Sequence, residues 1–254
     1  MAASTPLSGL DRLAVPAAVR ADLGDFIQQL VGFYRDDLKS ITVFGSAISG
    51  GYSESRSDLN LLVIYSDLNI ADLESVAKLA QRWFRKRRFA PRFVSEQNFS
   101  RSARFFQIDL LEMREAHVTV FGPDPLAAVE LCRADLHWQL SHEVKRMRMR
   151  LKQQYWRAAG DSGALRTILV RRFSSLAHLM QALLFLERGT VVLAMADIVA
   201  AAVDAWSLDR EFCERMLALK QGRWKPRGEE LTAAFGQLME AVRRIDDESD
   251  RVAV

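Results

Sequence analysis

The sequence has little of what marks secreted proteins and zinc-binding modules. It contains two cysteines in 254 residues, Cys132 and Cys213, whose separation fits no metal-ligand spacing. We therefore expect two free thiols in a reducing compartment, the cytoplasm. The first residues, MAASTPLSGLDRLAVP, lack the basic segment and apolar core of a signal peptide, and none is predicted.

Long uninterrupted apolar runs are also missing. The most apolar stretch covers residues 176–206, and Glu187, Arg188, Gly189 and Asp197 interrupt it. A membrane-spanning helix needs about 20 mostly apolar residues without such breaks. We therefore predict two buried helices in this stretch and expect no membrane partner.

A strong excess of one charge is absent as well. The chain has 35 lysines and arginines against 32 aspartates and glutamates, a net charge of +3. This small excess permits an anionic ligand but does not indicate a nucleic-acid-binding protein, so nucleic acid is not an expected partner. With 49% apolar and 26% charged residues, the composition is that of a globular protein with ample material for a core.

The N-terminal half alternates helix-like and strand-like patterns. Helical spacing of apolar residues predicts helices over 19–38 and 71–88. Short apolar runs predict strands over 41–45, 59–65, 90–95 and 104–113. These segments predict an α/β (α+β) domain with a small mixed sheet, covering residues 20–124.

From Pro125 onward the pattern is helical. Asp124 is a candidate N-cap for a helix that runs to about Ala159, and further helices follow. Breaks between them are expected at 160–163, 187–189, near 207 and at 222–228. We predict an all-α helical-bundle domain over 125–248, and we expect the acidic end, DDESDR, to be a solvated tail.

The most informative stretch is FGSAISGGYSESRSDLNLLVIY, residues 44–65. A strand that ends in Gly45-Ser46 and turns into a helix presents backbone N–H groups that favour an anion. Gly45 has no Cβ, which lets a phosphate approach the backbone, and Ser46 adds a hydroxyl donor. Taken singly, the Gly-Ser and Ser-Asp pairs are also typical of ordinary turns.

Asp58 and Asn60 follow at the start of the second apolar run. Residues i and i+2 of a strand face the same way, so these two side chains are expected on one face, with Leu59 pointing into the core. Two carboxylates at this spacing would suit Mg²⁺, which prefers oxygen ligands and is held by one or two carboxylates together with substrate phosphates. The second position, however, is an asparagine.

This stretch resembles the signature of the polymerase-beta nucleotidyltransferase superfamily. FQIDLLEMREAHVTVFGPDPL resembles, more loosely, the strand and turn that close the domain in the bacterial aminoglycoside-adenylyltransferase-like branch. The resemblance implies that the nucleoside triphosphate, ATP as the expected one, is held by Gly45 and Ser46, with Ser57 beside them. It also implies that Mg²⁺ is bound at Asp58 and at the position of Asn60.

The family's third acid lies on a neighbouring strand, and in this chain that position falls near Arg92. Asp109 is the one substitute, as a metal ligand or a base, with Glu112 behind it. The resemblance implies transfer of a nucleoside monophosphate, AMP as the expected group, from NTP–Mg²⁺ to a small-molecule or protein acceptor. Asn60 and Arg92 favour an alternative, a degenerate pseudoenzyme that serves as a nucleotide-binding or protein-interaction module.

Two further features are open to more than one interpretation. A basic cluster with interleaved aromatics could meet nucleic acid, but cations at a helix C-terminus with core-facing aromatics are the favoured interpretation; it comprises Arg82, Trp83, Phe84, Arg85, Lys86, Arg87, Arg88 and Arg92. Arg172 and His178 weakly resemble the Arg–His motif of HEPN-type RNases. His178 lies in an apolar run, where a packed and hydrogen-bonded histidine is more common.

Overall fold

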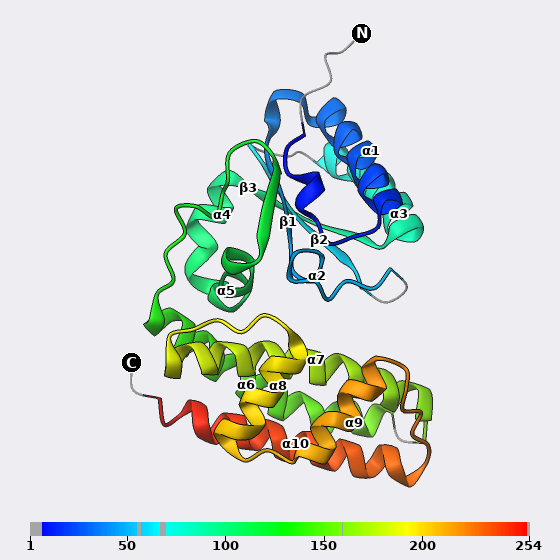
Figure 1. The fold of residues 1–254 in the computed structure, drawn as a ribbon, viewed down its shortest axis with the longest axis vertical. Helices are drawn as coiled ribbons and strands as arrows, with labels where there is room; N and C mark the ends of the chain where they lie inside the picture. Colours follow the sequence, from blue (N-terminus) through cyan, green and yellow to red (C-terminus); the bar gives the residue numbers. More distant parts are fainter. Residues whose placement is uncertain (1–6, 55–56, 67–69, 159, 253–254) are drawn as a thin grey trace. The chain divides into compact units, whose positions relative to one another are not determined.

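The computed structural model describes residues 7–54, 57–66, 70–158 and 160–252 (Figure 1). The chain forms two compact units. The first unit comprises Met1–Arg104 and Asp109–Glu130, and the second comprises Phe105–Ile108 and Leu131–Val254. The sequence places the boundary after residue 124, whereas the chain passes into the second unit after Glu130. The short segment 105–108 also belongs to the second unit.

The first unit is built on a four-stranded mixed sheet, in agreement with the predicted fold class. The strands are β1 (Leu38–Phe44), β2 (Leu59–Tyr65), β3 (Phe89–Ser95) and β4 (His117–Phe121), in the order β3-β2-β1-β4. β1 pairs antiparallel with both β2 and β4, whereas β2 and β3 are parallel. A parallel pair needs a crossover connection, and helix α3 (Ile70–Arg87) provides it.

One face of this sheet supports the hydrophobic core. Helix α1 (Ala17–Tyr34) lies beside α3, and together they cover the sheet (Figure 1). Alternate strand residues point into this core because the side-chain period of a strand is two; they are Ile41, Val43, Leu59, Leu61 and Val63. Asn60, at the intervening position of β2, therefore points to the opposite face of the sheet.

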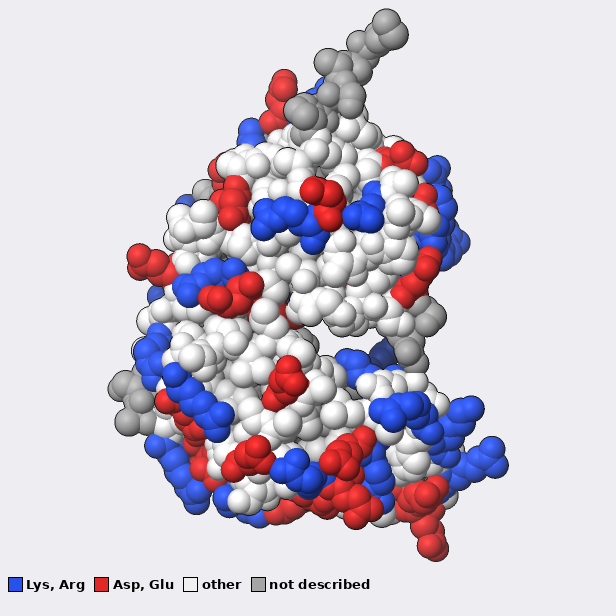
Figure 2. All heavy atoms as spheres, viewed as in Figure 1, with Lys and Arg blue, Asp and Glu red and all other residues white. Residues whose placement is uncertain are grey.

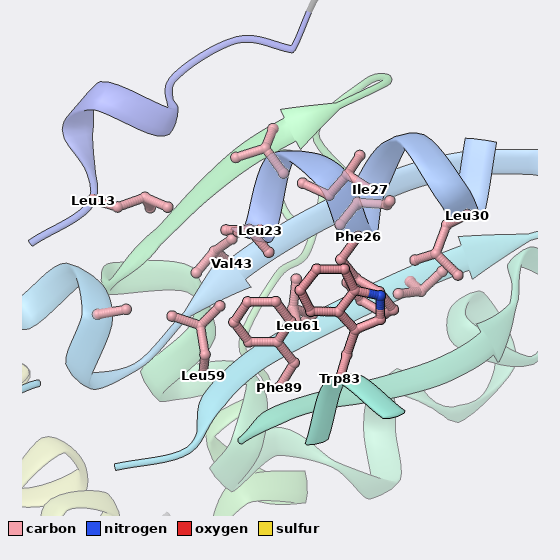
Figure 3. Packing of buried hydrophobic residues seen from close by; sticks show 14 of the residues in the cluster. Leu13, Leu23, Phe26, Ile27, Leu30, Val43, Leu59, Leu61, Trp83 and Phe89 are labelled. Carbon is pink, nitrogen blue, oxygen red and sulfur yellow. The ribbon is translucent and has the colours of Figure 1, made fainter. Parts of the chain in front are cut away.

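Trp83 anchors the end of α3 in this core. Its ring is buried and stacks on Phe89 at a centroid distance of 5.6 Å, with Phe26 at 6.0 Å (Figure 3). Of the two aromatics in the basic cluster, Trp83 therefore packs inside the protein, as the favoured interpretation required. For Phe84 the expectation of a core-facing ring is wrong, since this residue is 47% exposed.

The predicted strand over 104–113 is wrong. This segment contains a 3-10 turn, η3 (Ala103–Phe105), followed by helix α5 (Gln107–Glu115), and it comes after helix α4 (Glu96–Ser102). Its buried residues are 107, 108, 110, 111 and 113, and the adjacent pairs among them fit the spacing of a helix and not the alternation of a strand. Gln, Leu, Glu and Met also favour helices, and the segment has a single β-branched residue.

The second unit contains five helices along its described part, with breaks where the sequence predicts them. They are α6 (Arg133–Arg157), α7 (Ser162–Arg188), α8 (Met195–Trp206), α9 (Arg210–Lys220) and α10 (Glu229–Ser249). α6, α7 and α10 pack against one another, and α8 and α9 pack on α7. Among the described residues, no helix is both long enough and apolar enough to cross a membrane.

Two expectations for this half need correction. Helix α6 begins at Arg133 and not at Pro125, because the Asp124 carboxylate accepts a hydrogen bond from Leu126 N–H at 2.9 Å and caps only a turn. The acidic end is not a solvated tail either. It continues α10, where Asp246 is buried and accepts hydrogen bonds from Lys145 at 3.0 Å and Arg148 at 2.8 Å.

Candidate functional site

The turn after β1 requires a glycine. Gly45 has φ 79° and ψ −144°, a conformation that only glycine adopts readily. A Cβ built on Gly45 would lie 3.3 Å from Nδ2 of Asn60 and 3.5 Å from Oε1 of Glu112. Gly45 N–H donates to the carbonyl of Ala116 at 3.2 Å, which fixes the turn against the residue before β4. The missing Cβ of Gly45 thus leaves room for the side chains of Asn60 and Glu112, and the approach of a phosphate to this backbone stays a prediction.

Ser46 begins the short helix α2 (Ser46–Ser49) directly after this turn. The N–H groups of Ile48 and Ser49 donate to the Gly45 carbonyl, at 2.9 and 3.2 Å, which leaves those of Ser46 and Ala47 without a partner inside this helix. Because α2 has only four residues, its dipole is small, and individual N–H groups matter more than the helix as a whole. Ser57, the other expected phosphate neighbour, closes the following loop: its Oγ accepts from Ser53 N–H at 2.9 Å.

Asn60 and Glu112 converge on Gly45 from different elements. Asn60 lies opposite Phe44 in the β1–β2 ladder, and Glu112 comes from α5. Both side chains reach the space beside the Gly45 Cα. Glu112, which the sequence placed behind Asp109, is therefore the acid beside Asn60 and the glycine turn.

Asp58, the first expected metal ligand, is engaged by an arginine. Its Oδ1 accepts from Arg88 Nη2 at 2.7 Å and from Arg88 Nε at 2.9 Å. The two side chains are 43% and 44% exposed, so the pair lies at the protein surface. Arg88 comes directly before β3, and its carbonyl accepts from Leu59 N–H at 3.0 Å. This backbone contact brings Arg88 to the residue next to Asp58.

Asp109 is engaged in the same way. It lies in α5 and not on a strand of the sheet, and its Oδ1 accepts from Arg92 Nη1 at 2.7 Å. The Arg92 guanidinium also lies over the ring of Phe44, 5.4 Å from its centroid. Asp109 and Glu112 are three residues apart on one helix and so share a face. Both of the acids that the sequence proposed as metal ligands are therefore paired with arginines.

This donor set does not fit a magnesium platform of the expected kind. Mg²⁺ would require carboxylate oxygens, but Asn60 offers a neutral amide, and Asp58 and Asp109 already face guanidinium groups. Each guanidinium offsets the negative charge of the carboxylate that it contacts, which weakens the attraction of that carboxylate for a divalent ion. Within the part of the chain that the structure describes, no three acidic, histidine or cysteine side chains are grouped to hold a metal ion.

The basic cluster is largely paired within the first unit. Lys86 and Arg87 both bind the carboxylate of Asp22, at 2.8 and 2.5 Å, and Arg87 also reaches Glu54 at 2.5 Å. Hydrogen bonds from Lys86 and Arg87 lower the pKa of Asp22 below its ordinary value. On the face drawn in Figure 2, acidic and basic side chains are interspersed over this unit. These pairs favour the interpretation of the cluster as a helix end with cations.

Arg172 and His178 do not form a joint site. Both lie within α7, and six residues of helix separate them by about 9 Å along the axis and place them on different sides. Arg172 Nε donates to Gln154 Oε1 at 2.9 Å. Burial, together with the nearby Arg150 and Arg171, lowers the pKa of Arg172. This geometry gives the RNase interpretation no support.

Sequence reasoning placed Arg88 in the basic cluster but missed its ion pair with Asp58. Its role depends on a contact between the end of α3 and the start of β2, which has no local signature. The signal that could have identified this contact is the run of basic residues before β3. A basic residue that connects the end of α3 to β3 lies beside the strand that begins directly after Asp58. Arg92 was found because the third acid of the resembled family falls near that position.

Comparison with known proteins supports the fold. No protein-family model matches the sequence, and no curated protein matches it either. Among solved structures, the chain is similar to spectinomycin adenyltransferase AAD(9) from Enterococcus faecialis, determined with ATP and spectinomycin. The identity is 12% and the TM-score 0.56, and the match covers 88% of this chain and 98% of that chain. At this identity the likeness shows the fold alone: a unit with a small mixed sheet, followed by a helical unit.

Proposed function

We propose that this protein binds a nucleoside triphosphate, with ATP as the first candidate, through the Gly45-Ser46 turn of its first unit. We further propose that it acts as a nucleotide-binding module and not as a metal-dependent transferase. The observation that carries this proposal is the pairing of both expected metal ligands, Asp58 with Arg88 and Asp109 with Arg92, at 2.7 Å each.

Three features support nucleotide binding. The fold is that of an adenyltransferase determined with ATP. The Gly45 backbone is held in a glycine-only conformation, as expected where a ligand approaches the main chain closely. Ser46 supplies a hydroxyl at the start of α2, beside the N–H groups of Ser46 and Ala47, which have no partner inside this helix. Catalysis is disfavoured because Asn60 removes a unit of negative charge where the resembled enzymes hold their metal.

The test is a calorimetric titration of the wild-type protein with ATP. We expect saturable binding that Ser46→Ala weakens several-fold, because one hydrogen bond to a charged phosphate is lost. Ser49→Ala is the matched control, since it removes the same hydroxyl from the other end of α2. Equal effects of the two substitutions would contradict phosphate binding at the Gly45-Ser46 turn.

A second candidate is transfer of a nucleoside monophosphate, AMP as the expected group, to a small-molecule or protein acceptor. It is favoured by the exposure of both ion pairs: surface pairs contribute about 0–1 kcal/mol, so Asp58 and Asp109 can exchange partners at little cost. Glu112 also provides a carboxylate beside Gly45 and Asn60. Asp109 is then the candidate base.

Asn60→Asp separates the two candidates. The protein is incubated with magnesium and ATP labelled in the α-phosphate, and labelled product is measured for wild type, Asn60→Asp and the control Asn60→Ala. A transferase weakened by its asparagine should gain activity in Asn60→Asp but not in Asn60→Ala. If both variants remain silent across a panel of hydroxylated acceptors and proteins, the binding-module proposal stands and the transferase is rejected.

A further inference from the structure

Two arginines at the candidate site carry a positive charge that does not depend on a bound ion. Arg88 and Arg92 each hold one of the acids expected to bind metal, at 2.7 Å. The two guanidinium groups carry the same positive charge as one Mg²⁺ ion, and in the structure the carboxylates of Asp58 and Asp109 offset it. Unlike the ion, the guanidinium groups remain charged and in place whether or not a nucleotide brings metal with it.

The backbone at Arg88 adopts a conformation that is unusual for a residue with a side chain. Arg88 has φ 55°, in the left-handed region that L-residues with a Cβ rarely adopt. Its N–H donates to the Phe84 carbonyl at 2.7 Å and its carbonyl accepts from Leu59 N–H at 3.0 Å, so the position is fixed at both ends. Glycine would fit this conformation with less strain. An arginine here places a guanidinium beside Asp58, which glycine could not do.

Arg92 is directed toward the glycine turn by a different contact. It pairs with Leu62 in the β2–β3 register, on the same face of the sheet as Asn60. Its guanidinium lies 5.4 Å from the centre of the Phe44 ring, and Phe44 immediately precedes Gly45. Arg92 therefore lies next to the turn where the phosphates are proposed to bind.

In the part of the chain that the structure describes, the contacts of each guanidinium engage only some of its N–H groups. A guanidinium has five N–H donors. Arg88 uses two of its groups on a single oxygen of Asp58, and Arg92 Nη1 contacts Asp109. Arginine binds phosphate oxygens in bidentate fashion, and it can bridge a carboxylate and a phosphate at the same time.

We propose that the site takes the triphosphate group in its metal-free form, with Arg88 and Arg92 supplying the positive charge that Mg²⁺ supplies in metal-dependent nucleotide sites. This inference rests on the proposed nucleotide binding and names the ionic form of the ligand. It predicts that Mg²⁺ weakens the binding of ATP, because the ion occupies the phosphate oxygens that the arginines would contact.

The experiment compares ATP affinity in EDTA with affinity in excess Mg²⁺, for wild type and three variants. We expect wild type to bind ATP at least as tightly in EDTA. Arg88→Gly should weaken binding in EDTA by about tenfold, the effect of losing a charge-assisted contact. Arg35→Gly is the matched control: Arg35 also has a positive φ, 50°, and it lies at the end of α1. It should leave affinity unchanged.

Asp58→Asn best distinguishes binding of the metal-free triphosphate from binding of a metal–nucleotide complex. If Arg88 binds phosphate, removing the competing carboxylate should leave metal-free affinity unchanged or increase it. If Asp58 instead holds a metal, the same substitution should abolish Mg²⁺-dependent binding. Inorganic triphosphate, titrated in EDTA, shows whether the phosphates alone suffice, and it should compete with ATP.

The outcomes distinguish the two proposals. Binding that requires Mg²⁺ and is lost in Asp58→Asn overturns this inference and leaves nucleotide binding intact. Absence of binding in either buffer overturns both. Thermal unfolding of Arg88→Gly serves as the folding check: relief of the strained φ should offset the lost ion pair, so its melting temperature should match or exceed that of wild type. Weakened binding in a variant of unchanged stability supports the inference.

Discussion

Replacing Asp246 by asparagine should destabilise the helical unit measurably. Asp246 is 5% exposed and accepts hydrogen bonds from Lys145 at 3.0 Å and Arg148 at 2.8 Å. Hydrogen bonds to charged groups contribute about 1.5–3 kcal/mol each. Because both cations are about half exposed and asparagine keeps one acceptor, we expect a loss of about 2 kcal/mol in the free energy of unfolding.

Urea denaturation followed by tryptophan fluorescence measures this loss. Four of the five tryptophans lie in the second unit, so the signal reports chiefly on its unfolding: Trp138, Trp156, Trp206 and Trp224. With an m-value of about 2 kcal/mol/M, the midpoint should fall by roughly 1 M. Asp250→Asn is the matched control, since Asp250 also accepts from Lys145, at 2.7 Å, but is 61% exposed. Equal midpoints for the two variants would refute the reasoning.

The ion pairs of Asp246 with Lys145 and Arg148 also predict that stability depends on pH. Burial raises the pKa of Asp246, but hydrogen bonds from Arg148 and Lys145 lower it by more, so the pKa lies below its ordinary value. A carboxyl group with a depressed folded-state pKa adds stability above its unfolded pKa, near 4, and this contribution is lost as the pH falls through the lower folded value. Wild type should therefore lose more stability than Asp246→Asn on acidification below about pH 4.

Three other measurements test the packing of the two units. Trp83→Ala should cost about 3–5 kcal/mol, measured by urea unfolding of the first unit, because a large buried ring is lost. Gly45→Ala should cost about 1–3 kcal/mol and weaken ATP binding, since the new Cβ would lie 3.3 Å from Asn60 Nδ2 in a glycine-only conformation; unaltered stability would contradict a strained turn at this position. With a thiol reagent at pH 8, exposed Cys132 should react within minutes, whereas Cys213, whose pKa burial raises to about 12, should react only after denaturation.

Elements with a simple pattern could be predicted from the sequence. The strand over 59–65 and the helix over 71–88 agree with β2 and α3 to within one residue, because continuous burial and helical spacing leave strong marks on sequence. The strand predicted over 104–113 was wrong because a short apolar run fits either a helix or a strand. In the structure, the spacing of the buried residues of α5 is that of a helix.

The features that the sequence did not predict depend on contacts between residues that are distant in the chain. DDESDR looked like a solvated tail because its charges are local, whereas the partners of Asp246 lie about a hundred residues earlier, on α6. Asn60 lies beside the Gly45 turn, whereas the ion pair of Asp58 depends on Arg88, thirty residues later in the chain. Charge balance at a site is a tertiary property, and a motif alone does not fix it.

Titration of the wild-type protein with ATP in metal-free buffer tests the central claim most directly. Saturable heat with one ATP per chain, in the presence of EDTA, is the predicted result. It would establish a nucleotide site whose positive charge comes from the protein. An absence of heat up to millimolar ATP, with or without Mg²⁺, would contradict nucleotide binding at the Gly45-Ser46 turn.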